Sequence, residues 1–348
     1  MQLHTLLKLD PTLSLLQGDA EAFSVKRLTS FDDLSPEALC FVKNRKFAEV
    51  FKEKLEKKTE LKPSALIDQK YWDKLSKDEQ AFFKSRTESL ILSPDVPLSM
   101  VILSKAFYEE KFQGLQNLID GRQLGSTTID PSVEISQGAF IGPDVVIEEN
   151  VVIHSGVRIL GRCFIGAGTV IYPNTVIYHH VKIGKNCRIH SQSSIGADGF
   201  GYHFDGKQHL KIWHMGGVEI SDDVEIGACS AIDQGTFTPT LIGQGSKIDN
   251  HVQIGHNCQL GMGVIICGHV AIGGSSKLGN FVVFGGKSGM GDGMSLGDGC
   301  QVAGGALVNC DWPAGTVLGG HPARPLKEWM KGLATVRKLS LAREERSS

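Results

Sequence analysis

Large apolar residues recur at every sixth position over most of this chain. Isoleucine alone fills twelve successive positions at that spacing, from Ile129 to Ile195. A second long run of isoleucine, leucine, valine, phenylalanine and methionine extends from Ile242 to Val308. The fourth position after the large residue is usually small, as at Thr169. A period of six with one large and one small residue per unit predicts a mainly β fold, a parallel β-helix of hexapeptide repeats.

Three repeats are expected to form one triangular coil of about 18 residues, with the large residues stacked inside as ladders. Neighbouring coils would lie one strand spacing apart, about 4.8 Å. The frame lapses between Ile195 and Ile220 and skips four residues at 236–239. Glycine makes up 41 of the 348 residues, and we expect it at the tight corners, where φ > 0 is needed.

The eight cysteines include no CxxC pair, and a chain of this length does not suggest a disulfide framework. Four of them fall at the small fourth position of the repeat, where a thiol serves as a compact apolar filler. These are Cys163, Cys187, Cys258 and Cys300. We therefore expect reduced thiols with a structural role.

The balance of charge excludes some classes of partner. With 36 basic and 38 acidic side chains, the formal net charge is −2, which gives no general electrostatic reason to bind nucleic acid or a membrane surface. No apolar run approaches the ~20 residues that span a bilayer. The segment MQLHTLLKLDPTLSLLQGD is interrupted by Lys8, Asp10 and Pro11 and does not read as a secretion signal. We expect a cytoplasmic protein with no membrane span.

Composition divides the chain into three expected domains. Residues 1–118 mix helical and strand patterns, which predicts an N-terminal α/β domain. The elements expected in it include a strand at 64–68 and helices at 70–86 and 97–110. Residues 119–319 carry the β-helix repeats, and residues 320–348 form a C-terminal helical extension that starts at the prolines of HPARP (321–325).

Apolar residues of the C-terminal extension recur at helical spacing between Leu326 and Leu339. Its polar face is more basic than acidic. The basic residues are Lys327, Lys331, Arg337, Lys338, Arg343 and Arg346. A solvated face is one interpretation, and a docking surface for an acidic partner is the other.

The stretch IDNHVQIGHN (248–257) contains two histidines, His251 and His256. His256 lies two positions after Ile254, and positions one and two coils further on are Gly274 and Asp292. If the frame is unbroken, these residues stack along one edge. A glycine there leaves its N–H accessible beside an imidazole, and acyl transfer needs such a base and such a donor for the developing oxyanion. His256 is therefore a candidate general base, since a neutral imidazole prevails at cytoplasmic pH.

Two other interpretations of this stretch stay open. Asp249, Asn250 and Gln253 are either the polar corners that any β-helix exposes or groups that recognise a hydroxyl-rich substrate such as a sugar. A zinc site of the γ-class carbonic anhydrase type would use His251 and His256 with His214 as a third ligand. The register disfavours it, because His256 lies in the GHN turn and the residue five positions later is glycine.

Several motifs resemble the family of UDP-3-O-(3-hydroxyacyl)glucosamine N-acyltransferases, which act in lipid A biosynthesis. The matching stretches are IYHHVKIGKNC (177–187), IGADGFGY (195–202), VEIGACSAIDQG (224–235), IDNHVQIGHN (248–257) and GHPARPLKEW (320–329). The similarity spans nearly the whole chain. The hexapeptides alone would also fit other hexapeptide-repeat acyltransferases, whereas GADGFGY followed by the IDN and HN motifs is specific.

The resemblance implies a left-handed β-helix that forms a homotrimer, with active sites in clefts between subunits. It implies an acyl carrier protein bearing 4'-phosphopantetheine as donor, the 2-amine of a UDP-glucosamine as acceptor, and no metal or further cofactor. His256 would be the base and Gly274 the oxyanion donor. Asp249, Asn250 and Gln253 would orient the base or the sugar. The basic C-terminal helix would help to dock the carrier protein.

The resemblance also implies a uridine site in FVKNRKF (41–47). Phe41 and Phe47 would enclose the uracil, and Asn44 would hydrogen-bond its edge. The family usually has tyrosine at the position of Phe47, and a second histidine at the position of Gly293. Leu307 is expected to pack in the core, with a gauge of acyl-chain length as the alternative. A β-helix that serves only as a scaffold would lack the uridine site.

Overall fold

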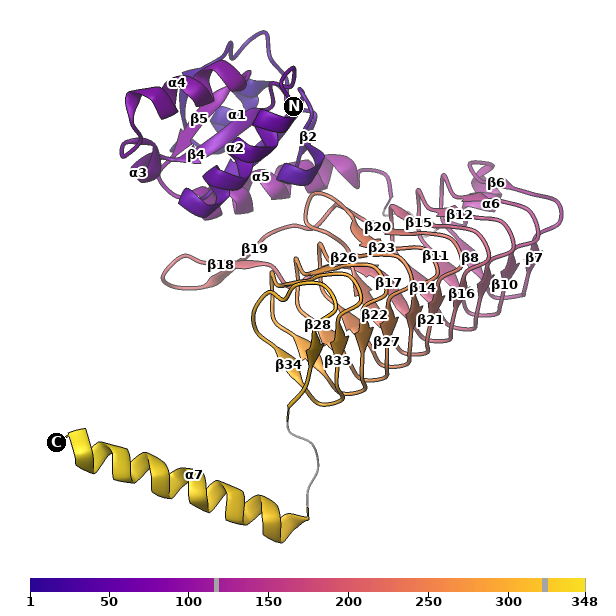
Figure 1. Cartoon of the computed structure of the whole chain (residues 1–348). Helices are drawn as coiled ribbons and strands as arrows, with labels where there is room; N and C mark the ends of the chain where they lie inside the picture. Colours follow the sequence, from indigo (N-terminus) through magenta and orange to yellow (C-terminus); the bar gives the residue numbers. More distant parts are fainter. Residues whose placement is uncertain (116–118, 321–324, 348) are drawn as a thin grey trace.

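The computed structural model describes residues 1–115, 119–320 and 325–347, with side chains up to Leu339. It contains an N-terminal α/β domain, a long parallel β-helix and a C-terminal helix, α7 (Leu326–Ser347) (Figure 1). The prediction of a mainly β fold built on hexapeptide coils is confirmed. The start of the HPARP boundary and the side chains of Arg343 and Arg346 lie outside the described part.

The N-terminal domain is built around a five-stranded sheet in the order β1-β5-β4-β3-β2. Its strands are β1 (Ser14–Gln17), β2 (Arg27–Leu28), β3 (Ala38–Val42), β4 (Ser64–Asp68) and β5 (Leu90–Ser93). All but β1 pair in parallel. Strands β3 and β5 are buried at every position, and their continuous apolar runs suit a parallel sheet with both faces covered.

The helices of this domain are α1 (Leu3–Leu9), η1 (Phe31–Asp33), α2 (Arg45–Lys57), α3 (Gln69–Trp72), α4 (Lys77–Arg86) and α5 (Val96–Lys111). The prediction of a single helix over 70–86 is wrong, because the chain forms two helices, α3 and α4, in this region. Ser76 accepts a hydrogen bond from Glu79 N–H while the Glu79 carboxylate accepts one from Ser76 N–H. This capping box starts a new helix.

The β-helix consists of three parallel sheets, one for each side of the coil. The ten-stranded sheet contains β7 (Glu134–Ile135), β10 (Val152–Ile153), β13 (Val170–Ile171), β16 (Arg188–Ile189), β21 (Glu225–Ile226), β24 (Lys247–Ile248), β27 (Ile265–Ile266), β30 (Val283–Phe284), β33 (Gln301–Val302) and β35 (Val317–Leu318). One nine-stranded sheet contains β8 (Phe140–Ile141), β11 (Arg158–Ile159), β14 (Val176–Ile177), β17 (Ser194–Ala197), β22 (Ala231–Asp233), β25 (Gln253–Ile254), β28 (Ala271–Ile272), β31 (Gly289–Met290) and β34 (Leu307–Val308). The other contains β6 (Thr128–Ile129), β9 (Val146–Ile147), β12 (Phe164–Ile165), β15 (Val181–Ile183), β20 (Val218–Ile220), β23 (Thr240–Ile242), β26 (Gln259–Leu260), β29 (Lys277–Leu278) and β32 (Ser295–Leu296). A short helix, α6 (Gly121–Leu124), precedes the first coil.

The repeated large residues point inward and form one core along the whole β-helix. The small fourth positions are buried too, including Cys163, Cys187, Cys258 and Cys300 at 2% exposure or less. All eight cysteines are free thiols, as expected. The prediction that Leu307 packs in the core is wrong, because its side chain is 75% exposed. Leu307 directly precedes the inward residue Val308 in β34 and therefore points outward.

Glycine was expected at the tight corners of the coil, but many glycines have a different role. The residue three positions after most inward residues adopts positive φ, and it is often not glycine, as at Asn174, His251 and Lys287. Many glycines instead follow the inward residue directly, where the backbone of the next coil approaches closely. A Cβ at Gly255 would lie 2.6 Å from Gly274 N. Close contact between coils, rather than φ, requires these glycines.

The two irregularities of the frame form an insertion and a contact with the N-terminal domain. The lapse after Ile195 contains the hairpin β18 (Tyr202–Phe204) and β19 (His209–Lys211), which projects from the coil (Figure 1). The four residues inserted at 236–239 bring Phe237 against Phe41 of β3, with ring centroids 5.5 Å apart. Among the described residues, no helix is long and apolar enough to cross a bilayer.

Candidate active site

Three residues stack at one corner of the β-helix. The pairings of β25 with β28 and of β28 with β31 keep an unbroken register. His256, Gly274 and Asp292 each follow the inward residue of one of these strands by two positions. The same register continues in the hydrogen bonds of the next residues, since Ser275 N–H donates to the His256 carbonyl (2.7 Å) and Gly293 N–H to the Gly274 carbonyl (2.8 Å).

Gly274 is buried directly against the His256 imidazole. A Cβ at Gly274 would lie 2.7 Å from Nε2, 2.9 Å from Cε1 and 3.0 Å from Cδ2 of that ring. Within the described chain, the backbone N–H of Gly274 has no acceptor, whereas the N–H groups of Gly273 and Ser275 are both bonded. A candidate base therefore lies against a residue whose backbone N–H is unbonded, and acyl transfer uses groups of these two kinds.

The amide of Asn257 determines which nitrogen of His256 carries the proton. Asn257 Oδ1 accepts from the Thr236 backbone N–H (2.9 Å), and Nδ2 donates to the Thr238 carbonyl (3.0 Å). These two bonds fix the orientation of the amide. Because His256 Nδ1 lies 3.0 Å from the same Oδ1, Nδ1 must be the donor. The lone pair of Nε2, beside Gly274, is then the site that accepts a proton.

One carboxylate lies near the base, and a second lies near the first. Burial raises the pKa of Asp233, at the end of β22, although a hydrogen bond from Gln253 and the proximity of His256 oppose that rise. Asp198 forms an ion pair with Lys211 on the insertion. Gln253 therefore acts on the site indirectly, by donating a hydrogen bond to Asp233.

The insertion brings a second histidine to the base. His214, between β19 and β20, is fully buried, and its ring meets His256 edge to face with centroids 5.1 Å apart. His251 lies at another corner and stacks on His269, with centroids 4.8 Å apart. The three histidines of the zinc hypothesis are therefore not gathered. No three histidine, cysteine or acidic side chains converge as metal ligands in the described ranges.

Asp249 and Asn250 follow β24, one corner before His256. Their polar atoms bond to nearby backbone: Asp249 Oδ2 accepts from Gly268 N–H (2.9 Å), and Asn250 Oδ1 from Ala228 N–H (2.7 Å). Gly293, where the resemblance expects histidine, occupies a corner with φ of 68°. An added Cβ there would meet no atom within 4 Å. Its corner leaves room for a ligand or a neighbouring molecule.

A cavity of about 340 Å³ joins the N-terminal domain to this corner. On one side it is lined by aromatic residues, among them Phe41 and Phe47. On the other it reaches Asn257 and Ser275, the direct neighbours of His256 and Gly274. Phe41 is 5% exposed and Phe47 is 36% exposed. The aromatic pair of the sequence motif therefore opens onto a cavity that reaches the chain neighbours of His256 and Gly274.

Positive charge lines the same cavity. Lys43, Lys54 and Lys277 all contribute to its wall. Asp32 of η1 pairs with Lys54 (2.7 Å) and with Lys277 of β29 (3.1 Å), which ties the N-terminal domain to the β-helix. Burial would raise the pKa of Asp32, but hydrogen bonds from the two lysines outweigh it and lower the pKa to about 2.

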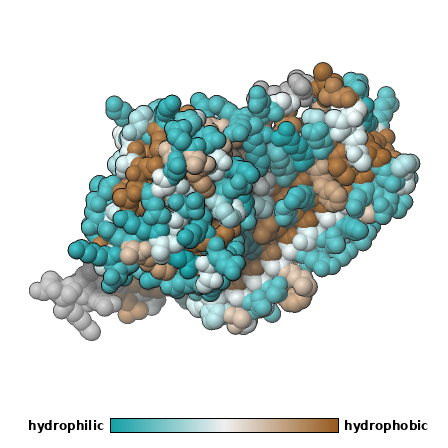
Figure 2. Space-filling model, turned by 90° about the horizontal axis from the view of Figure 1, so that it is seen from above, coloured by the Kyte–Doolittle hydropathy of each residue, from teal (hydrophilic) through white to brown (hydrophobic). Residues whose placement is uncertain are grey.

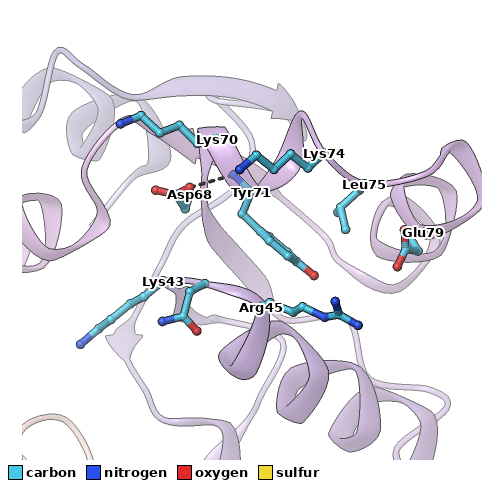
Figure 3. Close-up of a pocket in the computed structure, with 9 residues that line it drawn as sticks. Lys43, Arg45, Asp68, Lys70, Tyr71, Lys74, Leu75 and Glu79 are labelled. Carbon is cyan, nitrogen blue, oxygen red and sulfur yellow. Dashed lines mark hydrogen bonds between the residues drawn. The ribbon is translucent and has the colours of Figure 1, made fainter. Parts of the chain in front are cut away.

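Asn44 lies slightly apart from the aromatic pair. Its side chain caps α2 by accepting a hydrogen bond from Phe47 N–H (3.3 Å). It lines an adjacent cavity of about 530 Å³ rather than the one that contains Phe41. Figure 3 shows this second cavity, in which the Tyr71 ring extends toward Arg45. Asn44 and the two aromatic residues thus line different cavities.

Asn257, Asp233 and the role of His214 beside the base were not anticipated from the sequence. Asn257 stands in the HN motif next to His256, so adjacency to a candidate base was its available signal. Asp233 directly follows the inward residue Ile232, whose partner in the next coil is Ile254 once the four extra residues at 236–239 are allowed for. His214 lies where the repeat lapses, and no periodicity places it.

The coil and its repeat define a hexapeptide-repeat β-helix protein. Residues 239–274 match the family model described as bacterial transferase hexapeptide (six repeats), and residues 123–198 match the model of the GMPPB C-terminal domain. Both matches cover parts of the β-helix.

Within that class, the chain is similar to curated proteins named UDP-3-O-acylglucosamine N-acyltransferase. The protein of Parvibaculum lavamentivorans is 56% identical over 155 residues, which cover 44% of either chain. The protein of Azorhizobium caulinodans is 51% identical over 44% of this chain and 43% of its own. That of Helicobacter hepaticus is 42% identical over 43% of this chain and 46% of its own. The chain thus spans less than half the length of the relatives it matches.

Among solved structures, the chain is similar to a UDP-N-acetylglucosamine acyltransferase from Campylobacter jejuni. The identity is 27%, over 53% of this chain and 68% of that one, with a TM-score of 0.38. A second, the UDP-N-acetylglucosamine acyltransferase of Francisella novicida, is 24% identical over 59% of this chain and 71% of its own, with a TM-score of 0.37.

Proposed function

We propose that this protein is an N-acyltransferase that moves a 3-hydroxyacyl group from acyl carrier protein to the 2-amine of UDP-3-O-(3-hydroxyacyl)glucosamine. The observation that carries the proposal is the contact between His256 Nε2 and Gly274 beside a cavity lined by Phe41 and Phe47. A base, an oxyanion donor and an aromatic pocket are the three parts that acylation of a nucleotide sugar needs. The relatives' names support the same reaction.

In the proposed reaction, the sugar amine attacks the thioester carbon, and His256 Nε2 accepts the proton that the nitrogen releases. The carbonyl oxygen becomes an oxyanion, which the Gly274 N–H stabilises. Collapse of this intermediate breaks the C–S bond, and the imidazolium returns its proton to the departing phosphopantetheine thiolate. The amide and the free thiol are the products, and neither a metal nor a further cofactor takes part.

The cavity suits a uridine diphosphate in this reaction. The exposed ring of Phe47 and the buried ring of Phe41 offer apolar faces to a planar base. Lys43 would pair with the diphosphate, and Lys54 and Lys277, which share Asp32 as their ion-pair partner, would add positive charge to the wall. Asn44, Asp249 and Asn250 remain proposed contacts to the uracil edge or the sugar, and Gln253 a proposed contact through Asp233.

We propose a homotrimer, with acyl carrier protein as the macromolecular partner, in the cytoplasm. Figure 2 shows hydrophobic surface running along the β-helix between hydrophilic residues. Exposed apolar side chains of the β-helix include Ile265, Phe281 and Leu307, and exposed apolar surface supports contacts with other proteins. Helix α7 carries exposed Lys327 and Lys331, which suit an acidic carrier protein.

Reconstitution tests the proposed function directly. Purified protein would be incubated with UDP-3-O-(3-hydroxyacyl)glucosamine and carrier proteins bearing 3-hydroxyacyl chains of several lengths. We expect a new amide, detected by mass spectrometry, and one free thiol for each amide. Absence of amide with every chain length would refute the proposal. The same series measures the preference for chain length.

Removing the exposed aromatic ring of Phe47 is expected to weaken UDP binding. Stacking of a base on an aromatic side chain is worth roughly 1–3 kcal/mol, so Phe47→Ala should raise the Kd about 10-fold or more in calorimetry. Phe82→Ala is the matched control, because Phe82 also has a lysine ammonium over its ring (5.3 Å, against 5.5 Å at Phe47) but lies outside the cavity. Equal affinities for all three proteins would argue against the uridine site.

A further inference from the structure

His214 is held rigidly between the insertion and the base. An added Cβ at Gly199 would lie 2.8 Å from His214 Nε2 and 2.5 Å from His256 Cβ, and one at Gly201 would lie 2.7 Å from His214 Cε1. The glycines therefore let the backbone close over both rings. The flanking chain is fixed as well, since Trp213 N–H donates to Ser104 Oγ of α5 (3.1 Å).

One nitrogen of His214 has no partner. Nδ1 lies 2.9 Å from the Ile212 carbonyl, which can only accept, so Nδ1 carries the hydrogen. In the neutral ring, Nε2 is then an acceptor. It is buried and, among the described residues, unbonded. A buried acceptor without a partner lowers the stability of a fold, and such a group calls for a reason.

The charge of His214 is set by its surroundings. Burial, followed by the neighbouring His256, lowers the pKa of His214 to about 4, so the ring is neutral at pH 7. The charge of Asp198 raises the pKa of His214, and the charge of Lys211 lowers it. Asp233 faces His256 from β22, and Asp292 lies two coils beyond it at the same corner.

We propose that His214 is a positioning residue for the base. Its ring holds the His256 imidazole above Gly274, and the bare Nε2 lone pair offers negative potential to the imidazolium that His256 becomes. A protonated His214 could not do this, because two adjacent cations repel. The inference rests on the proposed function, since it assigns His256 the role of base.

Two substitutions test the roles of the two ring nitrogens of His214 separately. In His214→Asn, the amide nitrogen reaches the position of Nδ1 and keeps the bond to the Ile212 carbonyl, while the lone pair of Nε2 is lost. In His214→Gln, the amide oxygen reaches the position of Nε2. We expect kcat to fall about 10-fold in the Asn variant and to recover within about threefold of the parent in the Gln variant. KM for the UDP-sugar should stay within about twofold in both, because His214 does not line the cavity.

His180 provides the matched control. Its Nε2 is also buried without a partner in the described chain, but its ring packs on Phe112, with centroids 5.2 Å apart. His180→Asn should therefore leave kcat unchanged. Parental kcat in His214→Asn would overturn the proposal. So would a loss of kcat that the Gln variant does not recover or that is accompanied by an equal loss of UDP binding, because a purely structural role predicts those results.

The wild-type protein provides a test that needs neither a variant nor activity. With ¹⁵N-labelled histidine, NMR should find His214 neutral at pH 6 with its hydrogen on Nδ1. A charged ring, or a hydrogen on Nε2, would overturn the proposal even if the variants do not fold. If the parent protein makes no amide, the proposed function fails, whereas this measurement still decides the state of His214.

Discussion

Replacing His256 with alanine is expected to lower kcat for amide formation by a factor of about 10² to 10⁴, the usual contribution of a general base. The imidazole is the group placed with Nε2 against Gly274, and the neighbouring His214 has its only bare nitrogen buried and cannot replace it. The measurement is a steady-state assay with hydroxyacyl carrier protein and UDP-3-O-(3-hydroxyacyl)glucosamine. Affinity for UDP should remain unchanged, because His256 does not line the aromatic cavity.

His251→Asn is the control for this experiment. His251 belongs to the same ten-residue stretch but stacks on His269 at another corner, and asparagine tolerates its φ of 59°. This variant should keep parental activity and stability. If His256→Ala turned over within about 10-fold of the parent, another group would have to be the base. A melting temperature close to that of the parent would show that loss of activity is not loss of fold.

The β-helix was predictable because its strongest constraint is local and repeats. Inward positions such as Ile159 and Ile254 are fully buried, so a single frame determines strand, corner and stacking partner. That frame brought His256 and Gly274 together from residue numbers alone. It also placed Val308 inward, so the outward position of Leu307 followed from the alternation along a strand, which the expectation of core packing overlooked.

The parts that the sequence did not predict depend on contacts between distant segments. His214 reaches His256 through an insertion whose path is set by packing on α5, as in the bond from Trp213 N–H to Ser104 Oγ. Phe237 contacts Phe41 across two domains. The break between α3 and α4 came from a local signal at Ser76, a capping box that was present in the sequence and not used.

Substituting alanine at Gly274 is expected to reduce kcat about 100-fold while leaving the fold intact. The three atoms nearest to the added Cβ all belong to the His256 ring, at 2.7 to 3.0 Å. No positive φ is required at this position, so alanine adds no backbone strain, and the side chain of His256 can rotate away. A displacement of about 1 Å at a reacting group is enough for a loss of this size. The ring would then leave its place against Gly274.

Gly286→Ala is the matched control for Gly274→Ala. Gly286 also lies two positions after an inward residue, Phe284, and its added Cβ would meet only the Gly268 carbonyl oxygen, at 3.4 Å. We expect parental kcat in this control, and in both variants a UDP affinity and a melting temperature close to those of the parent. Full activity in Gly274→Ala would contradict the assigned geometry of base and donor. Equal losses in both variants would instead point to a general effect of filling the corners of the coil.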